Sequence, residues 1–360
     1  MSDSVGTNRS ALRDPGLPAP SRGEEGSAGS DLTVGRPRLS EVLRPPARPR
    51  FATLATLPSN TQSVEAAMQF STGALDFVAL VGPSGCGKSH LLGAAAERLS
   101  GNGRDGSIRV VSAAEWVQDP RRRDTVEPLL LDNVQDVLAL GRQRQALSLA
   151  LERRVRFGRP TMLSFTYPKL TRQVRTFLPS PEVWAVIPIT LPQPAEREDL
   201  VRHLCRLEGM TLAPGLVWQI AHAMHGNGQT ICGTLKRLKL NKSEWCDSSS
   251  QLLAMGILSP FFADNGGWDL RQTVAEVADA ILPALDRERR VDLAIYVLLG
   301  VCSLPEVEVA AYFGITPRTA YQRYRKVLRG LPYDADLKTC VDRLIQGAVQ
   351  RLCGSRKFTA

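Results

Sequence analysis

The sequence predicts an α/β fold with a parallel sheet, followed by an all-helical region. Short apolar runs alternate with helical segments from Phe51 to about residue 190, which is typical of parallel strands joined by crossover helices. The strand pattern ends after Pro192, and the later segments carry apolar residues at helical spacing. A glycine-rich segment ending in Lys88-Ser89 lies between the first apolar run and a helical segment, as an α/β fold of this kind requires.

The strands and helices can be placed by their apolar runs. Five buried strands are expected, at 75–81, 108–112, 128–133, 160–165 and 183–189. Helices are expected between them, including SHLLGAAAERLS and RQALSLALERRVRFG, because leucine and alanine recur there at three- and four-residue spacing. Three amphipathic helices follow at 194–209, 213–225 and 229–241.

Composition limits the class of protein. The chain has 360 residues, which favours two or three domains, and its hydrophobic share of 43% and charged share of 22% predict a soluble globular protein. The sequence contains no apolar run of about eighteen residues and no signal-like N-terminus, so neither membrane insertion nor export is expected. Seven cysteines without a CxxC pair predict a reducing cytoplasm and no zinc site.

The net charge of +9 favours a polyanionic partner, although basic chains without such a partner also exist.

We divide the chain by composition. Residues 1–50 are expected to be a disordered, basic arm rich in proline and glycine: a solvated tail is favoured, and contact of its arginines with DNA or another subunit is the alternative. The other divisions are an α/β domain at 51–191, a helical lid at 192–250, a linker at 251–270 and a helical domain at 271–360.

The glycine-rich segment matches the phosphate-binding P-loop, G-x-x-x-x-G-K-[ST]. Its residues are Gly82, Pro83, Ser84, Gly85, Cys86, Gly87, Lys88 and Ser89, and His90 follows. In such a loop, backbone N–H groups face phosphate oxygens, the lysine reaches the β and γ phosphates, and the serine hydroxyl ligates Mg²⁺. We therefore expect ATP or ADP with Mg²⁺ as the cofactor, bound by these residues. Hydrolysis does not follow from this motif.

The second magnesium residue is expected at the end of a neighbouring strand, where LLL is followed by Asp132 and Asn133. Asp132 can hold the water shell of the ion. Many such ATPases carry a second acid at the next position, and an amide cannot accept the proton of the attacking water. We expect hydrolysis to be absent or slower than about one turnover per second, with Gln135 or Asp136 as possible substitutes. Ser164 and Thr166 either sense the γ-phosphate or are plain strand-end residues.

The order of these motifs resembles the AAA+ module of the replication initiator DnaA and of the related regulator Hda. The resemblance covers residues 51–241 and includes the P-loop, LLLDN, the strand TMLSFTYP and the lid sequence from Leu191 to Leu240. It implies a nucleotide-binding AAA+ sheet with a helical lid, and self-association or contact with another replication protein. The pair Asp132-Asn133 is more similar to Hda than to DnaA.

Besides Asn133, two positions depart from the DnaA pattern. Gln229 stands where the lid of the family has an arginine that contacts the γ-phosphate, which puts lid-based sensing of ATP in doubt. Thr176 stands at the position of the inter-subunit arginine, and Arg175 is one residue away, which is about 100° around a helix. Arg175 is therefore either a weak candidate for that role or an exposed helix residue.

A DNA-binding helix–turn–helix is expected within residues 303–326. A capping box of Ser303 and Glu306 would begin the first helix, Gly314 would supply the turn, and Thr316 with Pro317 would begin the second helix. Val307, Ala310, Ala311, Ile315, Ala320 and Tyr324 are expected to face inward. Arg318, Thr319 and Gln322 are the candidates for contacts with the bases of double-stranded DNA, and Arg323, Arg325 and Lys326 for contacts with its phosphates.

A structural helical hairpin with a solvated basic face is the alternative at this segment. The region from Arg290 resembles the start of the helical DNA-binding domain of DnaA, but FGITPRTAY replaces the signature of that family. Recognition of the DnaA box therefore does not carry over.

Four functions fit the sequence to different degrees. A DnaA-type initiator and a DnaA-related regulator rank nearly level, and DNA binding is common to both. A small-molecule kinase would need a further pocket with catalytic acids. A transcription regulator whose nucleotide module has lost ATP hydrolysis would show no dependence on nucleotide.

Overall fold

The computed structural model describes residues 49–101, 108–119, 125–167, 172–223, 227–263 and 269–353. Almost all of the predicted arm, 1–50, lies outside these residues. Within them, five parallel strands form one sheet in the order β2-β3-β4-β1-β5, which confirms the predicted α/β class. The strands are β1 (Phe77–Gly82), β2 (Val110–Ser112), β3 (Leu129–Asp132), β4 (Thr161–Thr166) and β5 (Ala185–Pro188).

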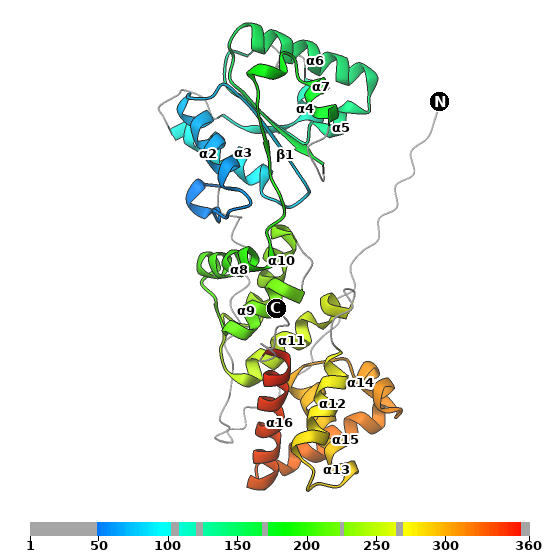
Figure 1. Cartoon of the computed structure of the whole chain (residues 1–360). Helices are drawn as coiled ribbons and strands as arrows, with labels where there is room; N and C mark the ends of the chain where they lie inside the picture. The colour runs from blue at the N-terminus through cyan, green and yellow to red at the C-terminus, as the bar shows by residue number, and fades with distance from the viewer. Residues whose placement is uncertain are drawn as a thin grey trace, which may run out of the picture. The chain divides into compact units, whose positions relative to one another are not determined.

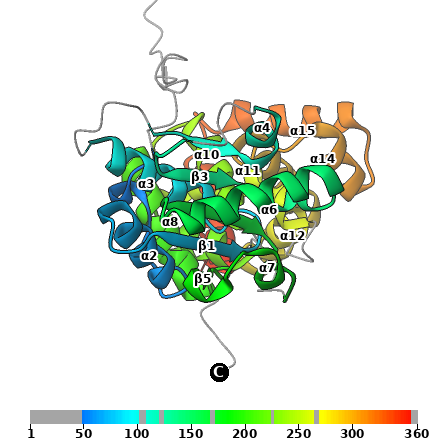
Figure 2. The same cartoon turned by 90° about the horizontal axis from the view of Figure 1, so that it is seen from above.

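Helices cover both faces of the sheet because its strands are apolar on both sides. In β1, Val78 and Leu80 belong to one buried cluster, and Ala79 and Val81 to another on the opposite face. Helices α2 (Thr61–Thr72) and α3 (Lys88–Gly101) lie side by side in both views and supply the first cluster (Figure 1, Figure 2). The second cluster includes residues of α4 (Ala113–Gln118), α5 (Gln135–Leu138), α6 (Gly141–Arg156) and α7 (Arg172–Phe177).

The register of the sheet brings several strand ends to one edge. β1 pairs with β4 so that Gly82 lies opposite Thr166, and β2 pairs with β3 so that Ser112 lies opposite Asp132. Parallel strands all point the same way, so the loops that follow β1, β3 and β4 meet at this edge. The P-loop follows β1 directly.

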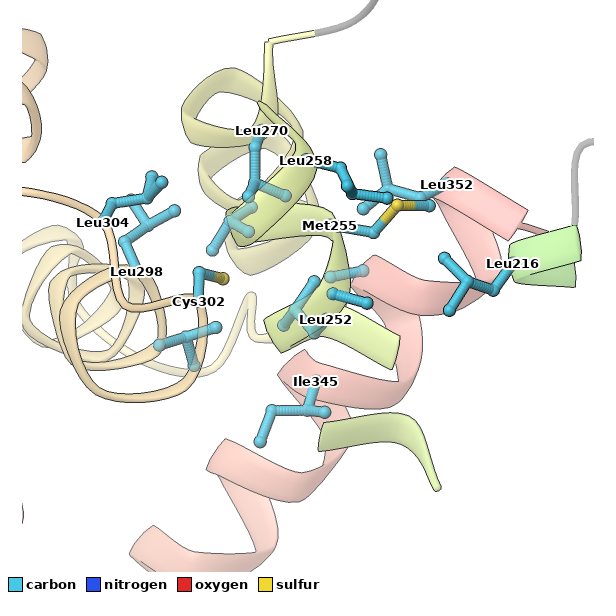
Figure 3. Packing of buried hydrophobic residues seen from close by; sticks show 14 of the residues in the cluster. Leu216, Leu252, Met255, Leu258, Leu270, Leu298, Cys302, Leu304, Ile345 and Leu352 are labelled. Carbon is cyan, nitrogen blue, oxygen red and sulfur yellow. The ribbon is translucent and has the colours of Figure 1, made fainter. Parts of the chain in front are cut away.

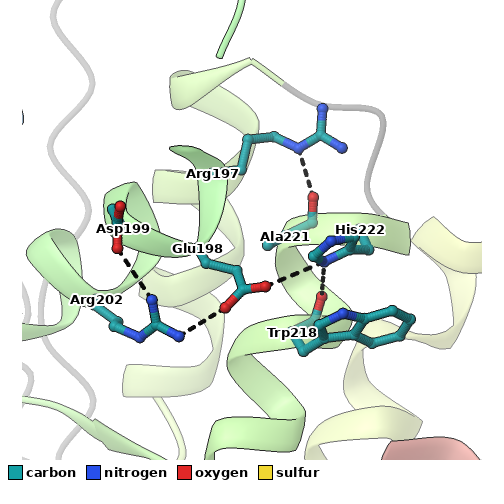
Figure 4. Close-up of polar contacts among 7 residues, drawn as sticks. All are labelled: Arg197, Glu198, Asp199, Arg202, Trp218, Ala221 and His222. Atoms are coloured by element: carbon teal, nitrogen blue, oxygen red, sulfur yellow. Dashed lines mark hydrogen bonds and ion pairs between the residues drawn. The ribbon is translucent and has the colours of Figure 1, made fainter. Parts of the chain in front are cut away.

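The three predicted lid helices are present as α8 (Pro194–Glu208), α9 (Pro214–Ala223) and α10 (Gly228–Lys239). Two short parallel strands, β6 (Thr211–Leu212) and β7 (Glu244–Trp245), join this region and were not predicted, because two-residue strands leave no periodic pattern. Helices α8 and α9 are linked on their outer side (Figure 4). Glu198 accepts a hydrogen bond from Arg202 and lies 3.8 Å from the Nδ1 atom of His222, whose ring stacks on Trp218.

The C-terminal region of the described chain is helical. It contains α11 (Ser248–Ala263), α12 (Leu270–Ile281), α13 (Arg287–Tyr296), a π-helical turn (Val297–Val301), α14 (Glu306–Phe313), α15 (Pro317–Gly330) and α16 (Ala335–Cys353). Helix α11 occupies most of the predicted linker, 251–270. Its residues Leu252, Met255 and Leu258 are fully buried in a cluster that also contains Leu216 of α9 and Leu352 of α16 (Figure 3). The lid and the C-terminal helices therefore share one hydrophobic cluster.

Candidate functional site

The P-loop has the backbone conformation that its glycines permit. Gly85 and Gly87 have φ angles of +72° and +99°, in the left-handed region that other residues rarely adopt. The loop therefore turns tightly from β1 into α3, whose N-terminus begins at Lys88. A helix N-terminus and curled backbone N–H groups together form an anion-binding surface.

The ammonium group of Lys88 lies inside this loop. The side chain is 5% exposed, and Nζ donates hydrogen bonds to the carbonyl oxygens of Gly82 (2.9 Å) and Pro83 (2.7 Å). The sulfur of Cys86 lies 3.7 Å from Nζ. Burial raises the pKa of the Cys86 thiol, which outweighs the opposite effect of Lys88. The thiol therefore stays neutral, and the positive charge of Lys88 is available to an anion held by the loop.

Asp132 lies at the end of β3 and is bound to the neighbouring strand β4. Its Oδ1 atom accepts hydrogen bonds from the hydroxyl of Ser164 and from the backbone N–H of Asn133 (3.1 Å). Both of these bonds go to Oδ1, so Oδ2 is the atom that can meet the water shell of a metal ion. Ser164 is fully buried and engaged with Asp132, which favours the plain strand-end interpretation of this residue.

Asn133 is held in a network of amide and hydroxyl groups. Its φ of +55° is a left-handed conformation that asparagine tolerates better than most residues. The Oδ1 atom of Asn133 accepts weak hydrogen bonds of 3.4 Å from Gln135 Nε2 and Thr166 Oγ1, and Gln135 Oε1 accepts from the N–H of Thr166 (2.9 Å). None of these three side chains is a proton acceptor of the carboxylate type. Asp136 accepts a hydrogen bond from Gln135.

A pocket of about 710 Å³ connects the P-loop, the strand ends and the lid. Residues 84–90 of the P-loop line one part of it, with Asn133 and Thr166 at the strand ends. A segment from Thr53 to Asn60 lines a second part, and α8 and α10 line a third, the last through Gly228, Gln229, Cys232 and Lys236. The sequence-predicted residues Ser84–His90 are therefore brought together here. Asp132 lies next to Asn133 but is not itself part of the pocket wall.

The N-terminus of α10 contacts the P-loop directly. The side-chain amide of Asn227 donates a hydrogen bond to the carbonyl oxygen of Ser84 (3.0 Å), and the N–H of Gly228 donates to the carbonyl oxygen of Gly85 (3.1 Å). Asn227 also caps α10, because its Oδ1 accepts from the N–H of Thr230 (3.0 Å). A Cβ atom on Gly85 would collide with the Asn227 side chain. This contact closes the pocket from the lid side.

The segment before α2 is fastened to the P-loop helix and to the lid. The Nε2 atom of His90 lies 3.1 Å from Thr53 Oγ1, and that of His203 on α8 lies 3.2 Å from the carbonyl oxygen of Thr53. Glu196 accepts a hydrogen bond from the N–H of Ser59 (2.7 Å). His90 thus contributes to the pocket mainly by holding the segment that lines it.

The residues that depart from the DnaA pattern are exposed. Gln229 lies on the pocket wall, at the first turn of α10. Arg175 and Thr176 are exposed on α7, and the buried neighbour is Phe177, which packs edge-to-face on Phe165 at 6.3 Å between ring centroids. Arg175 lies away from the residues that line the pocket.

Helices α14 and α15 are joined by the predicted turn, but the first helix is rotated relative to the prediction. Gly314 has a φ of +64°, and Thr316 caps α15 by accepting from the N–H of Thr319, both as expected. The capping box of Ser303 and Glu306 is wrong, because α14 begins after Pro305 and has no side-chain cap.

The inward face of α14 is formed by Val309 and Ala310, whereas Val307 is 68% exposed and Ala311 is also exposed. Val309 and Ala310 lie in the buried cluster of the C-terminal helices, so packing selects this face of the helix. On α15, Ala320 is buried as predicted.

The six predicted DNA-contacting residues are on α15 and fall into different environments. Arg318, Gln322 and Arg325 are exposed. The hydroxyl of Thr319 is 2.8 Å from that of Thr316 and so belongs to the helix cap. Arg323 and Lys326 each lie 3.1 Å from a carboxylate oxygen of Asp292 on α13. Two of the predicted cations, Arg323 and Lys326, are thus engaged by a carboxylate, although Lys326 is itself exposed.

The chain is similar to several solved structures, whereas no family model and no curated protein sequence matches it. Domain III of the replication initiation protein DnaA from Thermotoga maritima has a TM-score of 0.50 and 18% identity, and the match covers 59% of this chain and 96% of that one. The chain has a DnaA-like AAA+ fold. AMPPCP-bound DnaA from Aquifex aeolicus gives 0.48 and 16%, over 85% and 98% of the two chains. A DnaA bound to AMPPCP and single-stranded DNA gives 0.47 and 17%, over the same shares.

The sequence analysis missed residues whose contact partners lie far away along the chain of this DnaA-like AAA+ fold. Asn227 precedes a helical pattern, which is a recognisable cap signal, but its contact with Ser84 spans 143 positions. Asp292 lies in the segment that resembles the start of the helical DNA-binding domain of DnaA, and its pairing with α15 leaves no local pattern.

Among the helices of the described residues, none could span a membrane. In the same part of the chain, no group of three or more His, Cys, Asp or Glu side chains is arranged to hold a metal ion. Magnesium at Ser89 and Asp132 would therefore depend on the phosphates and on water for most of its ligands, as is usual for this ion.

Proposed function

We propose that this chain is a DnaA-like protein that binds ATP or ADP with Mg²⁺, binds DNA, and acts in the initiation of chromosomal replication or in its regulation. The observation that carries the nucleotide part is the pocket in which the P-loop, the ends of β3 and β4 and the lid helix α10 meet. Its volume of about 710 Å³ lies in the range of small-molecule sites. Lys88 is buried within the loop beside the position expected for phosphates.

The roles of the pocket residues follow from the P-loop chemistry. Backbone N–H groups of residues 84–89 would hold the phosphates, and Lys88 would turn from the loop carbonyls to the β and γ phosphates. Ser89 would ligate Mg²⁺ directly, and Asp132 would hold its water shell through Oδ2. The segment from Thr53 to Asn60, which also lines the pocket, would receive the base.

The DNA part of the proposal is supported by the exposed basic face of α15. Arg318, Gln322 and Arg325 are exposed and follow a capped helix N-terminus, which is the arrangement by which a recognition helix reads the major groove. The proposed partner is double-stranded DNA, with self-association or a second replication protein as the further partner.

A second candidate is a transcription regulator whose nucleotide module has lost ATP hydrolysis. It is favoured by Asn133 and Gln229, which replace an acid and an arginine with amides at the two positions where a switch would operate. The altered residues also fit a replication regulator that binds ADP and ATP alike.

One titration separates an initiator from the two kinds of regulator. The purified full chain is titrated on a DnaA-box duplex and on a scrambled duplex, with ATP, ADP or no nucleotide, at fixed salt. Preference for the box that tightens cooperatively with ATP alone supports an initiator and contradicts a lost switch. Binding that ignores both nucleotide and sequence favours the regulator or the transcription regulator. Absence of duplex binding would overturn the DNA part of the proposal.

A further inference from the structure

The basic residues of α15 form two groups on different sides of the helix. Arg318, Gln322, Arg325 and Arg329 are all exposed and follow one another at spacings of four, three and four residues. This spacing places them on one face of a helix, opposite the buried Ala320 and Val327. We call these four residues the exposed stripe. Arg329 belongs to it by position although the sequence patterns did not single it out.

The second group consists of Arg323 and Lys326, on the side of α15 that faces α13. Both are bound to Asp292, whose side chain is 5% exposed. Oδ1 of Asp292 accepts a hydrogen bond from Arg323 Nη1, and Oδ2 accepts one from Lys326 Nζ, each at 3.1 Å. Glu288, one turn earlier on α13, lies 3.8 Å from Arg323 Nη2. The carboxylates of α13 therefore compensate this group.

We propose that Asp292 restricts the phosphate contacts of α15 to the exposed stripe by engaging Arg323 and Lys326 in hydrogen-bonded ion pairs. This inference rests on the proposed binding of double-stranded DNA. A phosphate that took either cation from Asp292 would leave a buried carboxylate with one partner fewer, and a buried charge that loses a partner is strongly unfavourable. Lys326 is 70% exposed, so its head group reaches solvent, and its Nζ atom lies 3.1 Å from Asp292, which it shares with Arg323.

The consequence concerns specificity. Phosphate contacts add affinity for any DNA sequence, whereas base contacts discriminate between sequences. A recognition helix with all its cations free would bind non-specific DNA more tightly. By compensating two of them, Asp292 lowers the sequence-independent part of the affinity while leaving Arg318 and Gln322 free to contact bases.

The test measures how duplex affinity depends on salt, using the full chain and a short labelled duplex of scrambled sequence. Each added phosphate contact steepens the slope of log K against log salt by about 0.9. We expect Asp292→Asn to tighten binding at low salt and to steepen the slope by about 0.9 to 1.8, because one or two cations are released. Asp336→Asn, which removes the same charge from an exposed position on α16, is the control and should change the slope much less.

Two further variants keep the test valid if Asp292→Asn does not fold. In the wild-type background, Arg329→Ala should flatten the slope by about 0.9, and Lys326→Ala should leave it nearly unchanged. Adding Lys326→Ala to Asp292→Asn should remove part of the gain. An Asp292→Asn protein that is folded but has the wild-type slope overturns the inference, as does Lys326→Ala flattening the slope as much as Arg329→Ala. If the wild-type chain binds no duplex at low salt, the proposed function itself fails.

Discussion

At the scale of the residue, we propose that Asn133 limits how fast bound ATP is cleaved. Its amide oxygen lies 3.4 Å from Gln135 Nε2 and from Thr166 Oγ1, and these neighbours offer no carboxylate to take a proton from water. A positioned general base contributes about 10²–10⁴-fold to a rate. Slow hydrolysis is thus expected from the chemistry of one side chain, independently of how well the pocket holds ATP.

Asn133→Asp should therefore raise ATP turnover at least about tenfold from a wild-type rate below about one per second. Aspartate also tolerates the left-handed conformation found here, so the backbone need not change. Phosphate release at saturating ATP is the measurement, with Asn133→Ala as the control that removes the amide without adding a base. Unchanged turnover in a variant that still binds ATP would show that another group is missing.

The buried side chain of Arg154 on α6 binds the segment before β3 and the start of β4. It is 1% exposed, and its guanidinium donates to the carbonyl oxygens of Thr125, Glu127 and Pro160 and to the hydroxyl of Thr161, at 2.7–2.9 Å. Burial lowers the pKa of Arg154 to about 10, with a smaller effect of Arg159. The group remains charged at neutral pH, and the four oxygens compensate its desolvation.

Arg154→Met should lower the free energy of unfolding by about 3 kcal/mol, because it leaves several buried acceptors without a donor. Arg156→Met, at an exposed position on the same helix, should change it by less than about 0.5 kcal/mol. Urea denaturation of both variants measures the two free energies of unfolding. Equal stability of the two would mean that the carbonyl groups find water when the guanidinium is removed.

At the scale of the element, the N-terminus of α10 fastens the lid to the P-loop. Because Asn227 and Gly228 bind loop carbonyl oxygens rather than phosphate, this closure does not depend on the γ-phosphate. An arginine at position 229 would make closure sensitive to that group, and Gln229 carries no charge to do so. We expect ATP and ADP to be retained to similar extents.

Asn227→Ser tests this contact, since serine still caps a helix but is too short to reach Ser84. The loss of one hydrogen bond, about 1 kcal/mol, should speed the dissociation of ATP and ADP by about fivefold each. Stopped-flow release of fluorescent nucleotides measures both rates. Asn241→Ser, at the other end of α10, should leave them unchanged. A change confined to ATP would contradict closure that is independent of the γ-phosphate.

The elements also show how far the sequence predicts this fold. All five strands and the three lid helices agree with expectation within a few residues, because β1, β3 and β4 are apolar on both faces and α8 has a clear proline start. The P-loop could be placed from its local motif alone. The face of α14 could not, since small apolar residues occupy several adjacent positions and only packing selects Val309 over Val307.

The features of the site that the sequence did not predict are contacts between segments far apart in the chain. The hydrogen bond of Asn227 to Ser84 and the ion pairs of Asp292 join residues far apart in the chain, where periodicity and spacing give no information. The buried state of Ser164 likewise depends on its partner on β3.

At the scale of the whole molecule, one cluster connects the lid with the C-terminal helices. It contains Leu216 of α9, Leu258 of α11 and Leu352 of α16, and the side-chain amide of Gln219 on α9 donates a hydrogen bond to the carbonyl oxygen of Leu352. A shared core predicts that these helices lose their structure together, whereas the sheet has separate clusters of its own.

Leu258→Ala should lower the local stability of this cluster by about 2–5 kcal/mol. Amide hydrogen exchange should then speed up together in α9, α11 and α16 and remain unchanged in β1. Met162→Ala, in the sheet, is the matched control. It should speed up exchange in β1 and leave exchange in α9, α11 and α16 unchanged. Faster exchange confined to α11 would mean that the lid and the C-terminal helices are stabilised independently.

Calorimetric titration of the full chain with ATP and with ADP in the presence of Mg²⁺ tests most directly whether the pocket formed by the P-loop and the lid binds a nucleotide. We predict one site of similar affinity for both nucleotides, and a loss of at least about tenfold in affinity in Lys88→Ala, which removes a charge-assisted bond to phosphate. A folded wild-type chain that binds neither nucleotide, or Lys88→Ala with wild-type affinity, would contradict it.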